Sequence, residues 1–359
     1  MTSIEGAIDT MASTPGVQTL REIHGQPAAW VRAIEAASEM APRIADMWGT
    51  ALRGAIFTGC GSSYYLSRTA ASLYQERLRM PAWAHPGSDI MLYPAMSLGA
   101  TGPTALVAIS RSGETTEILR AVERFRQDAE GPVIAITCYA GTSLEAAADL
   151  SVVIEAAGEE SPVATRSFTS MLLAAQVIVT SLAREPVTHL EGLPGSCDRL
   201  LSDYGDLGRE LGADRRFERL FVLGGGALFG LASEAMLVVK ESSLSDGEAY
   251  HFLEFRHGPM TLVDTRTLVV GFVSQAAREH ELAVLAEMRD LGASVLAVLP
   301  DDAPTPAFDH SIVLPGGHAD HDRGPLYLPI MQLMAVHRAS AKGLDADRPT
   351  NLTAVITLT

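Results

Sequence analysis

Short apolar runs rich in β-branched residues alternate along this chain with longer stretches that carry apolar residues at helical spacing. In the first half, the apolar runs predict strands at 55–59, 106–110, 133–137 and 150–154. The intervening and following stretches predict helices at 62–78, 117–125, 143–148 and 168–183. Strands that are apolar at nearly every position and are separated by helices are typical of a parallel sheet covered on both faces.

The same pattern returns in the second half of the chain. Its apolar runs predict strands at 220–224, 268–274, 294–299 and 311–314. A helix is predicted after the first of these strands, through Lys240, and another at 326–341. The repetition indicates an internal duplication, so we expect an α/β protein with two three-layer αβα sandwiches in tandem.

The boundaries of these units are placed where proline and glycine interrupt the pattern. The first residues form an N-terminal segment with helical spacing, which Pro27 and Pro42 interrupt. We expect the N-terminal segment, the two units and a C-terminal tail at 1–50, 51–190, 200–343 and 344–359.

Two turns of the first unit are rich in glycine and hydroxyl side chains. Gly59-Cys60-Gly61-Ser62-Ser63 follows the first strand, and Ser110-Arg111-Ser112-Gly113-Glu114-Thr115-Thr116 follows the second. The carboxyl ends of parallel strands lie at one edge of the sheet, where ligands bind in such folds, so we expect the turns to meet. Backbone N–H groups, hydroxyls and the positive ends of helix dipoles then converge, an arrangement that suits a phosphate monoester.

The second unit lacks this hydroxyl cluster. Its corresponding turns are Gly224-Gly225-Gly226 and Ser274-Gln275-Ala276-Ala277, so one phosphate site is expected per chain. The first unit's turns fit neither a Walker loop, since no Gly-Lys-Ser/Thr follows, nor a dinucleotide fingerprint, since Gly-x-Gly-x-x-Gly is absent.

The composition narrows the possible partners. A net charge of −16 opposes binding to nucleic acid and leaves local donors to capture a phosphate. No apolar run approaches the ~18 residues of a membrane span. The N-terminus shows no secretory signal, so we expect a cytoplasmic protein without membrane contact. The three widely spaced cysteines predict neither a disulfide framework nor a zinc site, and they fit a reducing cytosol.

Two histidines, His318 and His321, lie in the segment Gly-Gly-His-Ala-Asp-His-Asp. We interpret this segment as a polar loop, because no further cluster of metal ligands accompanies it. We expect the protein to use no metal and no redox cofactor.

Four segments resemble the sugar isomerase (SIS) family, and above all the isomerase part of glucosamine-6-phosphate synthase and the stand-alone amino-sugar-phosphate deaminases and deglycases. They are 60–64 and 110–115 at the two turns of the first unit, 160–168, and Lys240-Glu241 with 248–259. The resemblance covers the chain from about residue 25 to its end. It implies two tandem SIS domains, each with a flavodoxin-like parallel sheet.

The resemblance also implies which residues hold the sugar phosphate. They come from the two turns and are Gly61, Ser62, Ser63, Ser110, Arg111, Ser112 and Thr115. Arg111 stands where the synthases usually have Gln; either its side chain donates to the phosphate, or it points to solvent while only its N–H binds. Val163 and Ala164 lie in a loop that would line the sugar hydroxyls, although both residues also suit simple packing.

Two further residues match catalytic positions of the family. Glu241 corresponds to the glutamate that moves a proton between C1 and C2, and one carboxylate can serve both carbons of an enediol or enolamine. His257 corresponds to a histidine that opens the sugar ring from the neighbouring subunit, which implies a homodimer with shared active sites.

Two departures from the synthases shape the expected activity. The chain begins Met1-Thr2-Ser3 and has no room for a glutaminase domain, so we expect no glutamine-derived ammonia. The family's Schiff-base lysine near the C-terminus is replaced by Ala354, and a second family lysine by Val238. Lys240 should point to a different helix face from Glu241.

These features predict an amino-sugar-phosphate isomerase/deaminase that converts glucosamine 6-phosphate to fructose 6-phosphate and ammonia. A deglycase of fructosamine 6-phosphates would use the same chemistry from the other end. A sugar-phosphate-binding module without turnover is the third alternative, and the presence of both Glu241 and His257 favours an enzyme.

Overall fold

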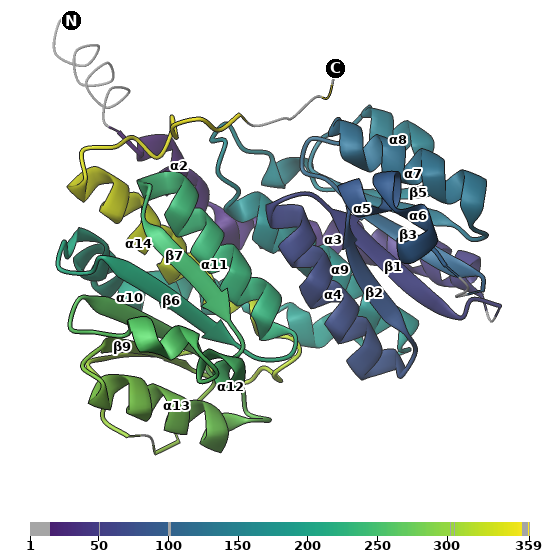
Figure 1. Ribbon diagram of the computed structural model, residues 1–359. Helices are drawn as coiled ribbons and strands as arrows, with labels where there is room; N and C mark the ends of the chain where they lie inside the picture. The colour runs from purple at the N-terminus through teal and green to yellow at the C-terminus, as the bar shows by residue number, and fades with distance from the viewer. Residues whose placement is uncertain are drawn as a thin grey trace, which may run out of the picture.

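The computed structural model describes residues 15–49, 51–99, 102–301, 303–304, 306–353 and 358. The predictions for residues 1–14 and for Ala354 lie outside the described residues. Within the described part, two parallel sheets form, each with five strands. Figure 1 shows the two sheets on either side of a central group of helices.

The first sheet has the strand order β2-β1-β3-β4-β5. Its central strands β1, β3 and β4 are buried at every position, as their apolar sequences predict. The strands are β1 (Gly54–Gly59), β2 (Ala82–Pro86), β3 (Thr104–Ile109), β4 (Val133–Thr137) and β5 (Leu150–Val153).

The second sheet repeats this topology in the order β10-β9-β8-β6-β7. Its strands are β6 (Arg219–Gly224), β7 (Asp246–Tyr250), β8 (Thr267–Phe272), β9 (Ser294–Leu299) and β10 (His310–Val313). In both sheets the first strand of the unit lies between the second and the third, so the flavodoxin-like order expected for each unit is confirmed.

The apolar side chains of each sheet divide between two packed layers. In the first sheet, Phe57 and Val107 face a core shared with α3, α4 and α9, whereas Ile56 and Leu106 face α7. The second sheet divides in the same way between α13 on one face and α10, α11 and α14 on the other. One continuous core, between the sheets, therefore joins the two halves.

The helices around the first sheet are α2 (Val17–His24), α3 (Gln26–Trp48), α4 (Ser62–Leu78), α5 (Gly87–Leu92), α6 (Pro94–Ser97), α7 (Thr116–Asp128), α8 (Ser143–Ala147) and α9 (Arg166–Leu182). Those of the second half are α10 (Leu193–Ala213), α11 (Leu228–Ser243), α12 (Phe252–Phe255), α13 (Arg278–Asp290) and α14 (Pro329–Ala341). Short 3-10 turns are η1 (Glu155–Ala157), η2 (Val187–Leu190), η3 (Pro259–Leu262) and η4 (Gly324–Tyr327).

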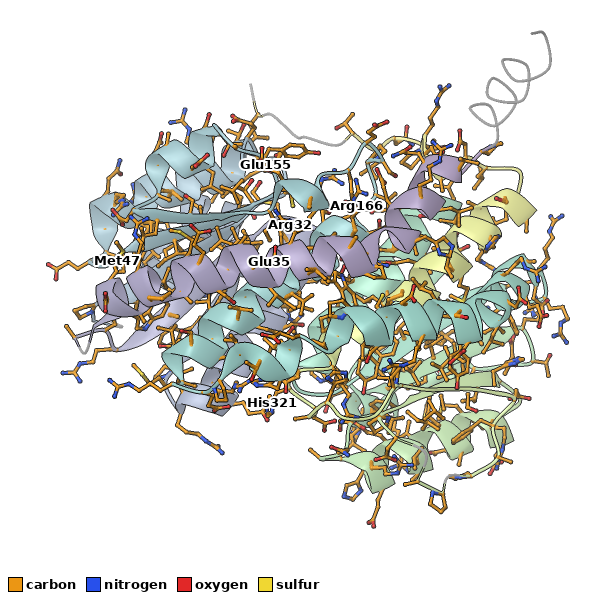
Figure 2. The ribbon with its side chains drawn as sticks, turned by 180° about the vertical axis from the view of Figure 1, so that it is seen from behind. Arg32, Glu35, Met47, Glu155, Arg166 and His321 are labelled. Carbon is orange, nitrogen blue, oxygen red and sulfur yellow. The ribbon has the colours of Figure 1, made fainter. Side chains whose placement is uncertain are left out.

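The N-terminal helices meet the prediction only in part. Pro27 lies in the first turn of α3, where a missing N–H costs nothing, so the break before it is confirmed. Pro42 lies inside α3 and does not end the helix, so the predicted second break is wrong. Figure 2 shows α3 running across the back of the molecule, with Arg32 and Glu35 paired on its outer face.

Among the described residues, no helix combines the length and the apolar character that a membrane span requires.

Candidate active site

The first glycine-rich turn joins β1 to α4. A Cβ on Gly59 would lie 2.3 Å from the carbonyl carbon of Ser63, so only glycine lets the helix begin this close to the strand. The Ser63 N–H donates to the Cys60 carbonyl at 3.1 Å and closes the turn. The N-terminus of a 17-residue helix therefore faces the edge of the sheet at Ser62.

The second turn joins β3 to α7. The Ser110 hydroxyl accepts a hydrogen bond from the Gly113 N–H at 3.1 Å and lies 3.4 Å from the Thr115 hydroxyl. Thr115 is the N-cap of α7, yet its hydroxyl accepts no hydrogen bond from the helix. Ser110 and Thr115 thus direct their hydroxyls together toward the sheet edge instead of closing the helix end.

The two turns line one cavity of about 170 Å³. The predicted site residues that line it are Gly61, Ser62, Ser63, Ser110, Arg111, Ser112, Thr115, Ala164 and Glu241. Cys60, Glu117, Leu352 and Thr353 also contribute to its wall. The sequence therefore identified most of the cavity, including the meeting of the two turns.

Glu241 reaches this cavity from the second half of the chain. It lies on α11, which packs against α4 of the first half (Figure 1). The helices approach closely at Gly230, where a Cβ would lie 2.3 Å from the Thr69 hydroxyl, and that hydroxyl donates to the Ala227 carbonyl at 2.9 Å. This contact places a carboxyl from the second unit beside the hydroxyl turns of the first.

Burial raises the pKa of Glu241 to about 7, and the positive charge of Arg111 opposes the shift. A carboxylate that is half ionised at neutral pH is a stronger base than an ordinary glutamate and still available to take a proton. A perturbed carboxyl in a cavity that can bind an anion is a typical feature of a catalytic centre.

A second carboxyl, Glu234, lies two helical turns before Glu241 on α11 and was not predicted. It is fully buried, and both of its oxygens lack hydrogen bonds of ordinary geometry to the described residues. Burial and the charge of Glu241 raise its pKa well above the ordinary value, while Ser62 and Arg111 lower it by less. The signal in the sequence is a lone carboxyl seven residues before Glu241, within an apolar helix.

Of the two orientations expected for the Arg111 side chain, the one toward solvent is wrong, and donation to a phosphate stays a prediction. Its guanidinium is largely buried and pairs with Glu159, and it also donates to the carbonyls of Ser161 and Pro162. The side chain therefore binds the loop that follows β5 while still lining the cavity.

Other predicted residues lie away from the cavity. His257 is exposed in the turn after α12 and does not line it. The side chain of Val163 is fully buried in the shared core, so only Ala164 of that pair faces the cavity. Lys240 is exposed, whereas Glu241 lines the cavity, as expected for neighbours on different helix faces.

The loop with the two histidines is held by polar contacts. His318 bonds the Ser196 hydroxyl at 2.9 Å, and His321 lies 3.7 Å from Asp322. Within the described residues, no group of three or more His, Cys, Asp and Glu side chains is arranged to hold a metal ion.

Comparison with known families defines the class of the first unit. Residues 53–181 match the sequence profile of the SIS domain, so the chain contains a SIS domain around the hydroxyl turns. The matched residues lie in the first half, and a second SIS domain in the other half stays a prediction.

Curated relatives agree with this assignment. The isomerizing glutamine–fructose-6-phosphate aminotransferase of Aeropyrum pernix is 31% identical over 366 residues, which cover 94% of this chain and 57% of that protein. The corresponding protein of Pseudomonas aeruginosa is 27% identical, with 94% and 58% covered. The chain thus spans less than two thirds of the length of these relatives.

Solved structures share the whole fold. The tagatose-6-phosphate ketose/aldose isomerase of Escherichia coli has a TM-score of 0.84 and 26% identity, covering 93% of this chain and 96% of that one. The glucosamine-6-phosphate deaminase of Thermotoga maritima has a TM-score of 0.79 and 24% identity, covering 95% and 100%. The C-terminal domain of the Francisella tularensis glucosamine-fructose-6-phosphate aminotransferase has a TM-score of 0.80 and 23% identity, covering 92% and 98%.

Proposed function

We propose that this chain is a sugar-phosphate isomerase that acts on an amino-sugar 6-phosphate and releases ammonia. The observation that carries the proposal is the position of Glu241, whose carboxyl has a pKa of about 7 and lines the same cavity as the two hydroxyl turns. The relation to isomerizing aminotransferases and the fold shared with a glucosamine-6-phosphate deaminase support it.

The phosphate would bind where the N-termini of α4 and α7 meet. Serine and threonine hydroxyls and backbone N–H groups donate hydrogen bonds there, and both helix dipoles favour a dianion. Local donors are needed because the chain carries a net charge of −16, which gives no long-range attraction for an anionic substrate.

Glu241 would carry the proton between the two reacting carbons. In open-chain glucosamine 6-phosphate, its carboxylate takes the C2 proton while O1 gains a proton, which gives an enolamine. The enolamine then takes the proton of Glu241 at C1 and its nitrogen gives up one proton, so the step is neutral in protons overall. The product is a ketimine, which water hydrolyses to fructose 6-phosphate and ammonia. Burial and the charge of Glu241 raise the pKa of Glu234 well above its usual value, which disfavours a second negative charge beside Glu241.

No enzyme amine is required for this route, because the substrate nitrogen already forms the imine. This agrees with the exposed position of Lys240. The resemblance to the SIS family assigns ring opening to His257 of a second copy, and the exposed position of His257, outside the cavity of its own chain, is compatible with that role. The proposed enzyme is therefore a homodimer with shared active sites.

A simple ketose/aldose isomerase is the second candidate. The 26% identity to a tagatose-6-phosphate ketose/aldose isomerase, across 96% of that chain, favours it. The proton transfer is the same and passes through an enediol, but no nitrogen is present and no ammonia is released. A fructosamine-6-phosphate deglycase would instead release a free amine and glucose 6-phosphate.

A coupled assay tests the proposal by following ammonia release from glucosamine and galactosamine 6-phosphates, with tagatose 6-phosphate and a fructosamine 6-phosphate as alternatives. We expect ammonia from an amino sugar, and a loss of ~10²-fold or more in kcat for Glu241→Gln. Glu281→Gln is the matched control, because Glu281 is also buried with a pKa of about 7 but lies on α13 and does not line the cavity. Full activity of Glu241→Gln would disprove its catalytic role. Turnover of tagatose 6-phosphate without ammonia from an amino sugar would favour the second candidate, and glucose 6-phosphate from a fructosamine 6-phosphate would favour a deglycase.

A further inference from the structure

Arg111 connects two walls of the cavity. It belongs to the turn after β3, yet its guanidinium donates to the carbonyls of Ser161 and Pro162 at 3.1 and 2.9 Å. It also lies 3.3 Å from the carboxylate of Glu159. A guanidinium is planar and presents its donors in a fixed fork, so bonds to two successive carbonyls fix both distance and orientation.

Glu159 is held firmly at the other end of this connection. Its Oε1 accepts hydrogen bonds from the Thr165 N–H and hydroxyl at 2.8 and 2.6 Å, and its Oε2 accepts one from the Ser167 hydroxyl. These donors lie at the N-terminus of α9. The side chain of Glu159 is fully buried, so the cost of burying its carboxylate is offset by these partners and by Arg111.

The outer side of the same loop is held by α2. The Glu22 carboxylate accepts hydrogen bonds from the N–H groups of Glu160 and Ser161 at 2.7 and 3.3 Å, and the Thr19 hydroxyl lies 2.9 Å from that of Ser161. The base of the loop is fixed by Arg166, labelled in Figure 2, which donates to the Gly158 carbonyl. With the outer side held, Arg111 determines how far the inner side lies from the phosphate turn.

We propose that Arg111 is a positioning residue, which sets the distance between the phosphate turn and loop 159–164 and thereby the width of the cavity in which Glu241 works. The proposal rests on the proposed function in that the cavity is taken as the substrate site. Arg111 does not hold the phosphate through its side chain, because the fork is turned toward the loop. Its loss displaces Pro162 and Ala164, which face the cavity.

The test compares Arg111→Gln with Arg278→Gln in the full chain. Arg278 is a matched control, because it also pairs with a carboxylate, Asp301, and donates to a carbonyl, that of Ala303, near the second sheet's turn. For Arg111→Gln we expect the affinity for inorganic phosphate to stay within about threefold, and kcat on glucosamine 6-phosphate to fall ~10²-fold, as for a misplaced substrate. We also expect faster amide hydrogen exchange in loop 159–164. Arg278→Gln should change none of these quantities.

Arg111→Lys adds a conservative variant that keeps the charge and loses the fork, and it should recover only part of kcat. A larger loss of phosphate affinity in Arg111→Gln would overturn the proposal, since the side chain would then be a phosphate ligand. Unchanged exchange in loop 159–164 would overturn it too. If the unaltered protein turns over no sugar phosphate, the proposed function fails, and phosphate affinity and hydrogen exchange still decide the role of Arg111.

Discussion

Ser110 and Ser274 occupy the same place in the two halves of the chain. Each follows a central strand, β3 or β8, and the hydroxyl of each accepts a hydrogen bond at 3.1 Å from the N–H three residues later. The surroundings then differ. The Ser110 hydroxyl lies beside that of Thr115 and lines an open cavity, whereas the Ser274 hydroxyl donates to the Glu281 carboxylate at 3.0 Å.

The turn after β8 is filled by the protein's own carboxylates. Asp320 accepts hydrogen bonds from the N–H groups of Gln275 and Ala276 at 2.7 and 3.2 Å, and Glu281 accepts one from the Ser274 N–H at 2.6 Å. A carboxylate thus takes the donors that an anionic ligand would use. The comparison teaches that turn geometry alone does not make an anion site; the groups opposite the turn must leave its donors available.

Replacing each of the two serines tests most directly whether only the turn of the first half binds phosphate. Ser110→Ala and Ser274→Ala each remove the hydrogen bond from the N–H three residues later, and Ser274→Ala also removes the bond to Glu281, so general damage to the turn should be at least as large in Ser274→Ala. Ser110→Ala should weaken binding of inorganic phosphate by ~10-fold or more, because a hydrogen bond to a charged ligand is lost. Ser274→Ala should leave phosphate affinity unchanged. Isothermal titration calorimetry measures both.

An equal loss in the two variants would contradict the assignment, because it would then report damage to a turn and not a lost ligand contact. An unchanged affinity in Ser110→Ala would place the phosphate away from this hydroxyl.

Much of this comparison could be predicted from the sequence. Apolar β-branched runs identify the central strands, and hydroxyl-rich residues after two of them identify the first cavity. The edge strands β2 and β7 escape the pattern, because each pairs on one side only and is partly exposed, so polar residues and Pro86 are tolerated. Helix α10 also escapes the pattern, because its glycines have a low helix propensity and weaken the helical signal.

The contacts within the site depend on packing that no local pattern encodes. The direction of Arg111 is set by carbonyls about 50 residues later, and Asp320 lies 45 residues beyond the turn that it fills. Burial, the largest cause of the raised pKa of Glu234, arises where α11 packs against the first half. Residue types at strand ends thus predict a site, while side-chain partners require the structure.

The pH dependence sharpens the comparison, because Glu241 and Glu281 both have pKa values of about 7. Only Glu241 lines the cavity, so kcat/KM should rise about tenfold per pH unit below 7 and level off above it, as for a base that must be ionised. Glu281→Gln should keep this profile. Stability runs the other way: the folded pKa values exceed the ordinary 4.5, so the folded state holds more protons, and stability falls as pH rises from about 4.5 to 7.

Rate profiles and urea unfolding, each measured across this pH range, check both statements. In Glu281→Gln the fall in stability with pH should become shallower while the rate profile stays in place. A rate profile that moves with Glu281→Gln would contradict the assignment of the rate to Glu241 alone.

The smallest expected effect comes from removing the carboxylate that fills the turn after β8. In Asp320→Ala the N–H groups of Gln275 and Ala276 lose their acceptor, which lowers stability. Added phosphate should supply the missing acceptor, so the rise of Tm with phosphate concentration should exceed that of the unaltered protein by ~2 °C, as for a weak added site. Asp320→Asn keeps an acceptor oxygen and should show no extra rise. If phosphate raises the Tm of Asp320→Ala no more than that of the unaltered protein, the carboxylate is not what keeps anions from the turn after β8. The difference between the halves must then lie in their hydroxyls.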